Sequence, residues 1–359
     1  MTQRLYKPTT LDRHNKVNLK NRIVMAPMTR CRAVNNIPSP MMKTYYEQRS
    51  EAGLIITEGT SPSQNGLGYA RIPGIFSQEQ VAGWKEITSG VKKRGTKIYL
   101  QVMHTGRVSH PENMSKTARI LAPSAVACPG NMYTDSKGMQ DYPTPSPMTE
   151  SDIASTISEY GHAAKLAMQA GFDGIELHGA NGYLIDQFLN TASNHRKDKW
   201  GGSIENRIRF GVAVTQAVVK EIGAEHVGMR ISPYGAFSGM IADPDMDKIY
   251  EHLCVELEKL KINYIHVVDH SSMGPPPVKQ ELKNQIRSLF RGRYILSGGY
   301  DAARAEADLA ENRGDLVAFG RPFIANPTLL SKMQKGQALT PPDPATFYTP
   351  GEKGYTDYL

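Results

Sequence analysis

Cysteine is scarce in this sequence, since only Cys31, Cys128 and Cys254 occur among 359 residues and no two of them form a CxxC pair. A small, odd and widely spaced set argues against a disulfide framework and against a structural zinc site. Such cysteine usage is typical of proteins that work in a reducing compartment. We therefore expect no metal site.

Long apolar runs are also missing. No stretch approaches the ~20 apolar residues that are needed to span a bilayer, and the polar segment 1–21 lacks the apolar core of a signal peptide. The formal charge of +7 comes from scattered basic residues, a pattern that favours a solvated face with anion-binding sites over a nucleic-acid surface. We expect a cytoplasmic monomer or homodimer that acts on a small molecule, without a nucleic-acid or membrane partner.

Short β-branched or apolar runs, bounded by glycine, proline or polar turns, recur along the chain and predict eight strands. They lie at residues 22–26, 54–58, 97–102, 174–178, 227–231, 264–268, 294–297 and 316–319. Most gaps hold a helical pattern, as in 151–170, which follows a candidate N-cap region at 149–152. The alternation predicts a parallel eight-stranded (β/α)8 TIM barrel, and no GxGxxG follows a strand to support a Rossmann fold.

Two segments do not fit the repeating pattern, and no linker divides the chain, so we expect one domain over residues 1–359. Residues 107–148, after the third strand, are rich in proline, serine and glycine and are too long for a plain connection. We expect them to form a capping insertion over one end of the barrel. The segment from Tyr6 to Leu19 precedes the first strand and is expected to cover the opposite, N-terminal end.

Polar groups recur at the C-terminal ends of the predicted strands, although strands covered on both faces should be almost wholly apolar. The residues at these ends are Glu58, Gln101, His178, Arg230, Asp269 and Ser297, while Thr29 and Arg321 follow just after other strands. Barrels place their active sites at this rim. Solvation alone is a poor explanation for six such residues on one rim.

Arg230 is the sharpest case because it lies inside the apolar strand Val227-Gly228-Met229-Arg230-Ile231. A buried guanidinium costs several kcal/mol unless an anion or ring acceptors receive its fixed donors. Either a ligand supplies those acceptors, or Arg230 forms a structural ion pair with Glu58 or Glu176.

The loop His178-Gly179-Ala180-Asn181-Gly182-Tyr183 closes the fourth strand. Two hydrogen-bond donors converging on a carbonyl or nitro oxygen would stabilise negative charge that develops there. A phenol suits proton donation to a strongly basic carbanion. The alternative is that His178 and Asn181 satisfy loop backbone and that Tyr183 is a core residue.

The last two strands end in Ser297-Gly298-Gly299 and in Gly320-Arg321. Barrels frequently bind phosphate in the loops after strands seven and eight, through backbone N–H groups that glycine lets approach closely. Arg321 adds a charged fork for phosphate oxygens. These features fit a phosphorylated cofactor across the rim with its ring near Gln101 and Arg230, although plain helix-entry turns would also use glycine.

At this point several long segments resemble the Old Yellow Enzyme family of FMN-dependent ene-reductases, in its branch of N-ethylmaleimide, morphinone and oxophytodienoate reductases. The similar segments are 21–30 (NRIVMAPMTR), 52–59 (AGLIITEG), 178–190 (HGANGYLIDQFLN), 194–207, which ends in WGGSIENR, the two phosphate loops, and the tail at 346–348 and 354–358. The resemblance runs over nearly the whole chain and implies tightly bound, non-covalent FMN with NADPH as reductant.

The resemblance also implies roles for individual residues around the flavin. Thr29 would hydrogen-bond the flavin O4, Gln101 the pyrimidine edge, and Arg230 the region of N1 and O2. The residues that line the ring by backbone would be Ala26, Pro27, Met28 and Gly59. The residues that hold the phosphate would be Gly298, Gly299, Gly320 and Arg321.

On the substrate side, the resemblance implies that His178 and Asn181 bind the substrate oxygen and that Tyr183 is the proton donor. Tyr69 and Tyr348 resemble aromatic residues of the pocket wall. The implied activity is reduction of activated C=C bonds in α,β-unsaturated carbonyl, maleimide or nitro compounds, by hydride transfer from flavin N5 and protonation by the tyrosine. The alternative within the family is action mainly on quinones or nitro esters.

One position departs from the family pattern. Where relatives usually have Gln-Leu-Trp-His, this chain has Gln101-Val102-Met103-His104. Loss of the indole is expected to widen or soften one pocket wall, which affects substrate range rather than flavin binding. The three scattered cysteines argue against flavin barrels that carry an iron–sulfur segment.

Overall fold

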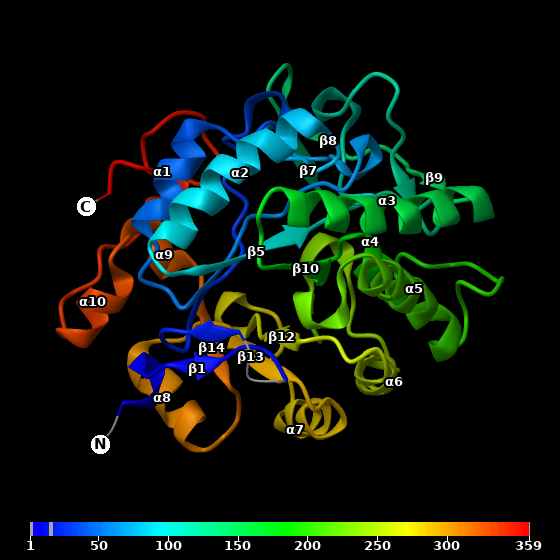
Figure 1. The fold of residues 1–359 in the computed structure, drawn as a ribbon. Coiled ribbons are helices and arrows are strands. Elements are labelled where there is room, and N and C mark those ends of the chain that lie inside the picture. Colours follow the sequence, from blue (N-terminus) through cyan, green and yellow to red (C-terminus); the bar gives the residue numbers. More distant parts are fainter. Residues whose placement is uncertain (1–2, 14–16, 359) are drawn as a thin grey trace.

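In the computed structural model, which describes residues 3–13 and 17–358, eight parallel strands close into a barrel (Figure 1). The order around the barrel is β10-β11-β12-β13-β14-β3-β4-β5. These strands span Ile23–Met25 (β3), Leu54–Ile56 (β4), Lys97–Val102 (β5), Gly174–Gly179 (β10), Val227–Ile231 (β11), Tyr264–Val268 (β12), Arg293–Ser297 (β13) and Leu316–Phe319 (β14). The predicted barrel and the place of each of its strands are confirmed, with the first two strands shorter than expected.

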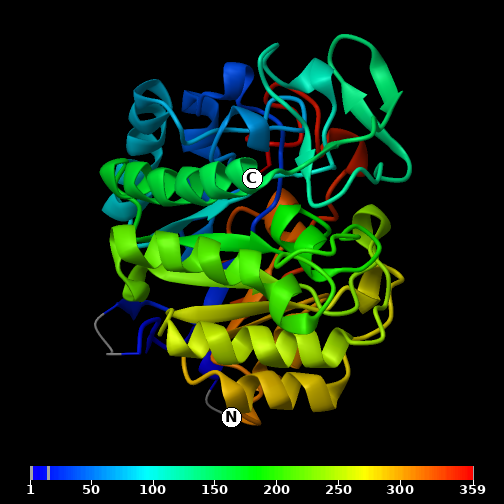
Figure 2. The same cartoon turned by 90° about the vertical axis from the view of Figure 1, so that its right-hand side faces the viewer.

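Helices surround the barrel (Figures 1 and 2). The α-helices are Pro40–Gln48 (α1), Gln78–Lys93 (α2), Glu150–Gln169 (α3), Leu184–Leu189 (α4), Ile204–Ile222 (α5), Met246–Lys259 (α6), Gln280–Leu289 (α7), Ala302–Ala310 (α8), Arg321–Ala325 (α9) and Leu329–Gln334 (α10). Short 3-10 helices lie at Arg4–Tyr6, Val34–Asn36, Gln64–Gly66, Pro111–Asn113, Ala224–His226, Phe237–Gly239, Ser271–Met273 and Pro344–Thr346. The predicted cap of α3 is present, since Thr149 and Asp152 bond each other's backbone reciprocally.

The side chains of each strand alternate between the barrel interior and the helical layer. In β4, Leu54 and Ile56 join the interior cluster, while Ile55 packs in the larger cluster with the helices. Tyr99 and Tyr264 fill the interior, and each faces a glycine of the neighbouring strand. A Cβ at Gly228 would lie 2.2 Å from the Tyr264 ring, so only glycine fits beside it. The alternation therefore decides which polar residues point into the barrel.

The N-terminal segment packs on the barrel interior. Thr9–Thr10 (β1) and Asn18–Leu19 (β2) pair as antiparallel strands, and Leu11 and Leu19 are buried in the interior cluster. In Figure 2 this hairpin, in dark blue, lies at the end of the molecule away from the insertion in teal. Residues 14–16 of the predicted cover lie outside the described residues.

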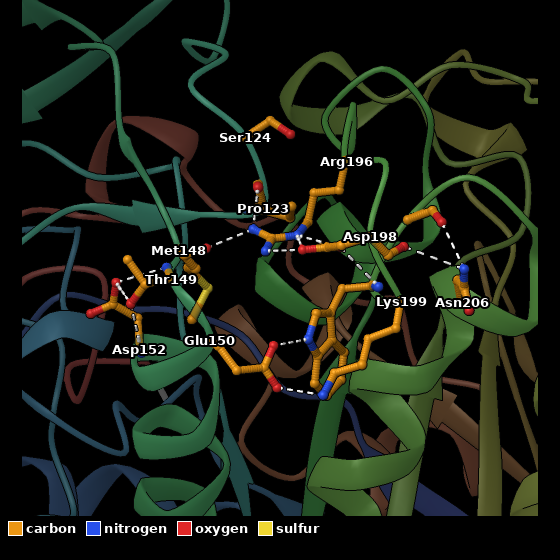
Figure 3. A network of polar contacts seen from close by, with 12 residues as sticks. Pro123, Ser124, Met148, Thr149, Glu150, Asp152, Arg196, Asp198, Lys199 and Asn206 are labelled. Carbon is orange, nitrogen blue, oxygen red and sulfur yellow. Dashed lines mark hydrogen bonds and ion pairs between the residues drawn. The ribbon is translucent and has the colours of Figure 1, made fainter.

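The insertion at 107–148 contains four short strands, β6 (Leu121–Ala122), β7 (Asn131–Thr134), β8 (Gly138–Asp141) and β9 (Ser146–Pro147). Its base is held by the loop that follows α4 (Figure 3). There Arg196 donates to the carbonyl oxygens of Pro123, at 3.0 Å, and of Met148, at 2.6 Å, and forms an ion pair with Asp198. One guanidinium thus ties the middle of the insertion, at Pro123, and its C-terminal end, at Met148, to the loop after α4.

The C-terminal segment is fastened by two buried arginines of the loop after β3. Arg30 donates to the carbonyl oxygens of Phe347 and Gly354, and its guanidinium lies over the Tyr355 ring. Arg32 donates to the carbonyl oxygens of Arg30, Thr346, Phe347, Gly351 and Lys353. The loop that carries Thr29 is therefore locked to the end of the chain.

Two further features can be excluded for the described part of the chain. It contains no helix that is both long and apolar enough to cross a membrane. It also contains no cluster of three or more His, Cys, Asp or Glu side chains with the spacing to hold a metal ion.

We predict that Arg32→Met lowers the free energy of unfolding by about 3 kcal/mol, because five carbonyl oxygens lose a charged donor. Limited proteolysis should also cut the segment after Thr340 sooner. Urea unfolding followed by tryptophan fluorescence measures the first effect. The matched control is Arg119→Met, which removes an exposed ion pair with Asp152 and should cost less than about 1 kcal/mol. Equal losses in the two variants would contradict the proposed lock.

Candidate active site

A pocket of about 770 Å³ opens at the carboxyl ends of the barrel strands. Its walls come from the ends of β3, β5, β10, β11 and β14, from the insertion and from the C-terminal segment. The predicted residues that line it are Pro27, Met28, Thr29, Tyr69, Gln101, His178, Asn181, Tyr183, Arg230, Arg321 and Tyr348. Segments far apart in the sequence thus meet around one cavity.

The floor of the pocket is built by strand register. Gln101 lies beside Glu176 and His178 lies beside Arg230, all on the inward-facing side of their strands. The Gln101 amide nitrogen donates to Glu176 at 2.8 Å, and His266 contacts the other oxygen of Glu176, also at 2.8 Å. The amide oxygen of Gln101 is then the atom left to face a donor in the pocket.

Arg230 is buried and, among the described residues, forms no ion pair or hydrogen bond. Its Nε is sealed from solvent with no partner. The structural ion pair with Glu58 or Glu176 is therefore not formed, although the charge of Glu176 raises the pKa of Arg230 against the dominant, lowering effect of burial. A buried charged donor without a partner costs about 1–3 kcal/mol, and a ligand that offers acceptors in the pocket would offset this cost.

Three of the six polar residues that the sequence predicts at the barrel rim do not line the pocket. Glu58 accepts hydrogen bonds from the Arg30 backbone and the Tyr46 hydroxyl, and burial raises its pKa to about 7. Asp269 pairs with Lys283 at 2.6 Å, and Ser297 is buried outside the pocket lining. The predicted convergence on the pocket therefore holds for Gln101, His178 and Arg230.

The loop after β10 brings two phenols and an imidazole together. The hydroxyls of Tyr183 and Tyr69 lie 3.0 Å apart, and the ring of His178 packs edge-on against Tyr183 with centroids 4.8 Å apart. Burial raises the pKa of Tyr183 to about 12, and the hydrogen bond with Tyr69 opposes this rise. Tyr183 thus lines the pocket as a neutral hydroxyl rather than filling the core.

His178 is held neutral. Burial lowers its pKa well below the ordinary value, and the charge of Arg230 adds to this effect. Its Nδ1 is buried without a partner in the described part of the chain. This imidazole does not satisfy loop backbone, which was the alternative, and one of its nitrogens is left for a ligand.

The wall made by the loop after β3 carries Pro27, Met28 and Thr29, and Ala26 is buried beneath it. Gly59 lies behind the pocket lining, where a Cβ would approach the Met103 sulfur to 2.5 Å. Met103 itself is buried in a cluster that Tyr69 and Tyr183 cover. Met103 supports the two tyrosines from behind and is not part of the pocket lining.

The predicted phosphate loops end two adjacent strands. Gly298 adopts φ +131, and a Cβ there would lie 2.1 Å from the Asp269 carbonyl oxygen, so glycine is required. Gly299 also has positive φ, and Gly320 has only ordinary contacts around its Cβ position. Arg321 is exposed and reaches the pocket lining, which Gly298, Gly299 and Gly320 do not.

Several pocket residues were missed by the sequence reasoning. The insertion contributes Asn131, Tyr133 and Tyr142, and the loop after β12 contributes His270 and Met273. His270 contacts the Asn181 side chain at 2.7 Å. Its position directly after Asp269 at a strand end was the one available signal.

This arrangement suits one kind of ligand. Arg230, Gln101 and Thr29 line the pocket with side chains that can bind a planar polar ring, and Arg321 adds a cation that can bind an anion. His178, Asn181 and Tyr183 line the same pocket and offer further polar groups to a reactant. The site therefore suits a phosphorylated planar cofactor with a reactant beside it.

Comparisons with known proteins agree with this geometry. The model of the NADH:flavin oxidoreductase / NADH oxidase family matches residues 4–340. A probable flavin mononucleotide-dependent alkene reductase of Leishmania infantum is 41% identical over 95% of this chain and 93% of its own length. The putative 12-oxophytodienoate reductase 3 of Oryza sativa subsp. japonica is 37% identical, with coverages of 96% and 90%.

The fold is shared with solved structures as well. Morphinone reductase in complex with tetrahydroNAD is 40% identical, with a TM-score of 0.93 over 99% of this chain and 97% of that one. The family match, the relatives and the barrel agree along almost the entire chain. This protein is therefore a member of the Old Yellow Enzyme family of FMN-dependent oxidoreductases, to which ene-reductases belong.

Proposed function

We propose that the protein is an FMN-dependent ene-reductase that uses NADPH to reduce activated C=C bonds of α,β-unsaturated carbonyl, maleimide or nitro compounds. The observation that carries this proposal is the position of the Tyr183 hydroxyl. It lines the same pocket as His178 and Asn181, above a floor made by Gln101 and Arg230. Once a bound cofactor supplies the hydride, reduction of such a bond needs an acid for the proton and groups that stabilise negative charge on the oxygen.

The residues present fit FMN. The guanidinium of Arg230 lacks an acceptor in the described chain, and the Gln101 oxygen faces the pocket, so a ring with acceptors and an N–H group satisfies both. Thr29 lines the same pocket, and Arg321 would hold the phosphate together with the loops of Gly298, Gly299 and Gly320, although these glycines do not themselves line the pocket. When bound, FMN supplies the hydride chemistry, and the protein supplies position and field.

His178 and Asn181 would bind the substrate oxygen. Both lie on the loop that closes β10, so their spacing is set by one short segment. The neutral imidazole and the amide can each donate one hydrogen bond to a carbonyl or nitro oxygen. Negative charge that develops on that oxygen is then stabilised in a buried setting, with Arg230 nearby.

Tyr183 would protonate the α carbon of the substrate. In this role Tyr69 would donate the 3.0 Å hydrogen bond between the two hydroxyls, which would leave the Tyr183 proton for the substrate and stabilise the phenolate that remains. Burial alone would make Tyr183 a weak acid, and the bond from Tyr69 counteracts that effect. Tyr69 therefore acts as more than a wall of the pocket, whereas Tyr348, 61% exposed, lies at its mouth.

The reductant would use the same pocket before the substrate. The morphinone reductase relative carries tetrahydroNAD in its solved structure. A nicotinamide carboxamide presents a carbonyl oxygen like that of an enone, so the same two donors can bind it. Sequential use of one pocket gives ping-pong kinetics.

We predict that Tyr183→Phe keeps FMN and its reduction by NADPH but loses on the order of 100-fold in enone turnover, since only the proton donor is removed. Anaerobic stopped-flow absorbance separates the two half-reactions, with 2-cyclohexenone, a maleimide, a quinone and a nitro-olefin as oxidants. Tyr6→Phe, which changes a half-buried tyrosine at the N-terminal end, is the matched control. Equal enone turnover in parent and Tyr183→Phe would refute the role of Tyr183.

The double variant His178→Ala, Asn181→Ala should weaken phenol binding by on the order of 10–100-fold, because two hydrogen bonds to the phenol oxygen are lost. Titration of the FMN-loaded protein with phenol, read at the long-wavelength charge-transfer band, measures this affinity. Flavin content serves as the internal control and should not change. An unaltered titration rules out these two residues as the oxygen-binding pair.

A further inference from the structure

His270, which follows β12, reaches across the pocket to a residue 89 positions earlier in the chain. Its Nε2 lies 2.7 Å from the Oδ1 of Asn181. The ring packs edge-on against Phe237, with centroids 4.6 Å apart, and this contact restricts its rotation. Both His270 and Asn181 line the pocket.

The backbone of Asn181 is fixed independently of this contact. Asn181 has a left-handed φ of 62, its N–H donates to the Ser232 hydroxyl at 2.9 Å, and its carbonyl accepts from Ser238 at 3.2 Å. Only the side-chain torsions remain to be set. The two ends of the amide differ chemically, because the oxygen accepts and the nitrogen donates.

The electrostatic surroundings of His270 decide its charge state, and the atom it contacts then sets its tautomer. Arg230 and Arg321 face the ring as cations and Asp269 as an anion, and burial, reinforced by Arg230, lowers the pKa of His270 to about 4. The ring is therefore neutral at physiological pH, with a single N–H. A 2.7 Å contact with an amide oxygen requires that N–H to be on Nε2.

From this geometry we propose that His270 is a positioning residue that holds the oxygen of Asn181, so that the amide N–H₂ points into the pocket and selects reactants with an oxygen acceptor. This inference rests on the proposed function, in which Asn181 binds that oxygen. With the amide reversed, Asn181 would present an acceptor and repel carbonyl and nitro oxygens. His270 is thus a specificity-determining group that need not touch the substrate.

A double-mutant cycle tests whether His270 acts through Asn181. Phenol affinity is measured on the FMN-loaded parent, on His270→Leu, on Asn181→Ala and on the double variant. We expect His270→Leu to weaken binding about tenfold in the parent and less than about twofold in the Asn181→Ala background. His270→Gln, which keeps an N–H donor, should restore most of the affinity.

The control for the histidine substitution is His162→Leu on the exposed side of α3, which should leave phenol affinity unchanged. If the effects of His270→Leu and Asn181→Ala simply multiply, His270 binds the ligand on its own and the proposal is overturned. If Asn181→Ala binds phenol like the parent, the oxygen-binding role in the proposed function fails instead.

A measurement on the unaltered protein keeps the proposal testable where a variant does not fold. Long-range ¹⁵N–¹H correlation NMR of the histidine side chains reports the tautomer of each ring. We expect the His270 proton on Nε2. A proton on Nδ1, with Nε2 as acceptor, would mean that the Asn181 amide is reversed and would overturn the proposal.

Discussion

A guanidinium with no acceptor, held inside a closed barrel, is the constraint around which this site is organised. Arg230 is 7% exposed and lines the pocket, and its neighbours in register offer it no oxygen within ion-pair distance among the described residues. Glu176 is the anion with the largest electrostatic effect on the pKa of Arg230, but its two carboxylate oxygens already contact Gln101 and His266. A ligand with acceptor atoms in the pocket would therefore relieve the energetic cost of burying Arg230.

The rest of the barrel makes that arrangement possible. Tyr99 and Tyr264 fill the interior below the polar layer, and the glycines opposite them allow the strands to approach. Above the layer, two arginines lock the loop of Thr29 to the C-terminal segment, which also supplies Tyr348 at the pocket mouth. The tyrosine packing below the polar layer and the arginine hydrogen bonds above it hold the residues around Arg230 in place. The site is therefore preorganised before a ligand binds.

Much of this could be predicted from the sequence, because the period of a strand fixes the side on which its residues lie. The strand around Arg230 and the loop from His178 to Tyr183 follow directly from that period and from barrel topology. The same logic placed Glu58 and Asp269 at the rim, yet local partners hold them away from the pocket. Such partners are brought together by tertiary packing, which the hydrophobic periodicity of the sequence does not reveal.

Contacts between segments far apart in the chain could not be predicted from the sequence either. The bond from His270 to Asn181 and the clamp from Arg32 to Gly351 join residues 89 and 319 positions apart. At Met103 the sequence predicted a contact that the structure lacks. Methionine in place of the family's tryptophan was expected to change the pocket wall, but Met103 lies in a buried cluster behind Tyr69 and Tyr183. Its influence on substrates must pass through those two rings.

The most direct test of the central claim is the affinity and reduction potential of FMN in Arg230→Met, with Arg230→Lys as the variant that retains charge. Fluorescence quenching on titrating FMN into the apoprotein gives the affinity. The account predicts a loss of on the order of 100-fold in Arg230→Met, a lower potential, and intermediate values for Arg230→Lys. FMN bound by Arg230→Met as tightly as by the parent, at the same potential, would contradict it.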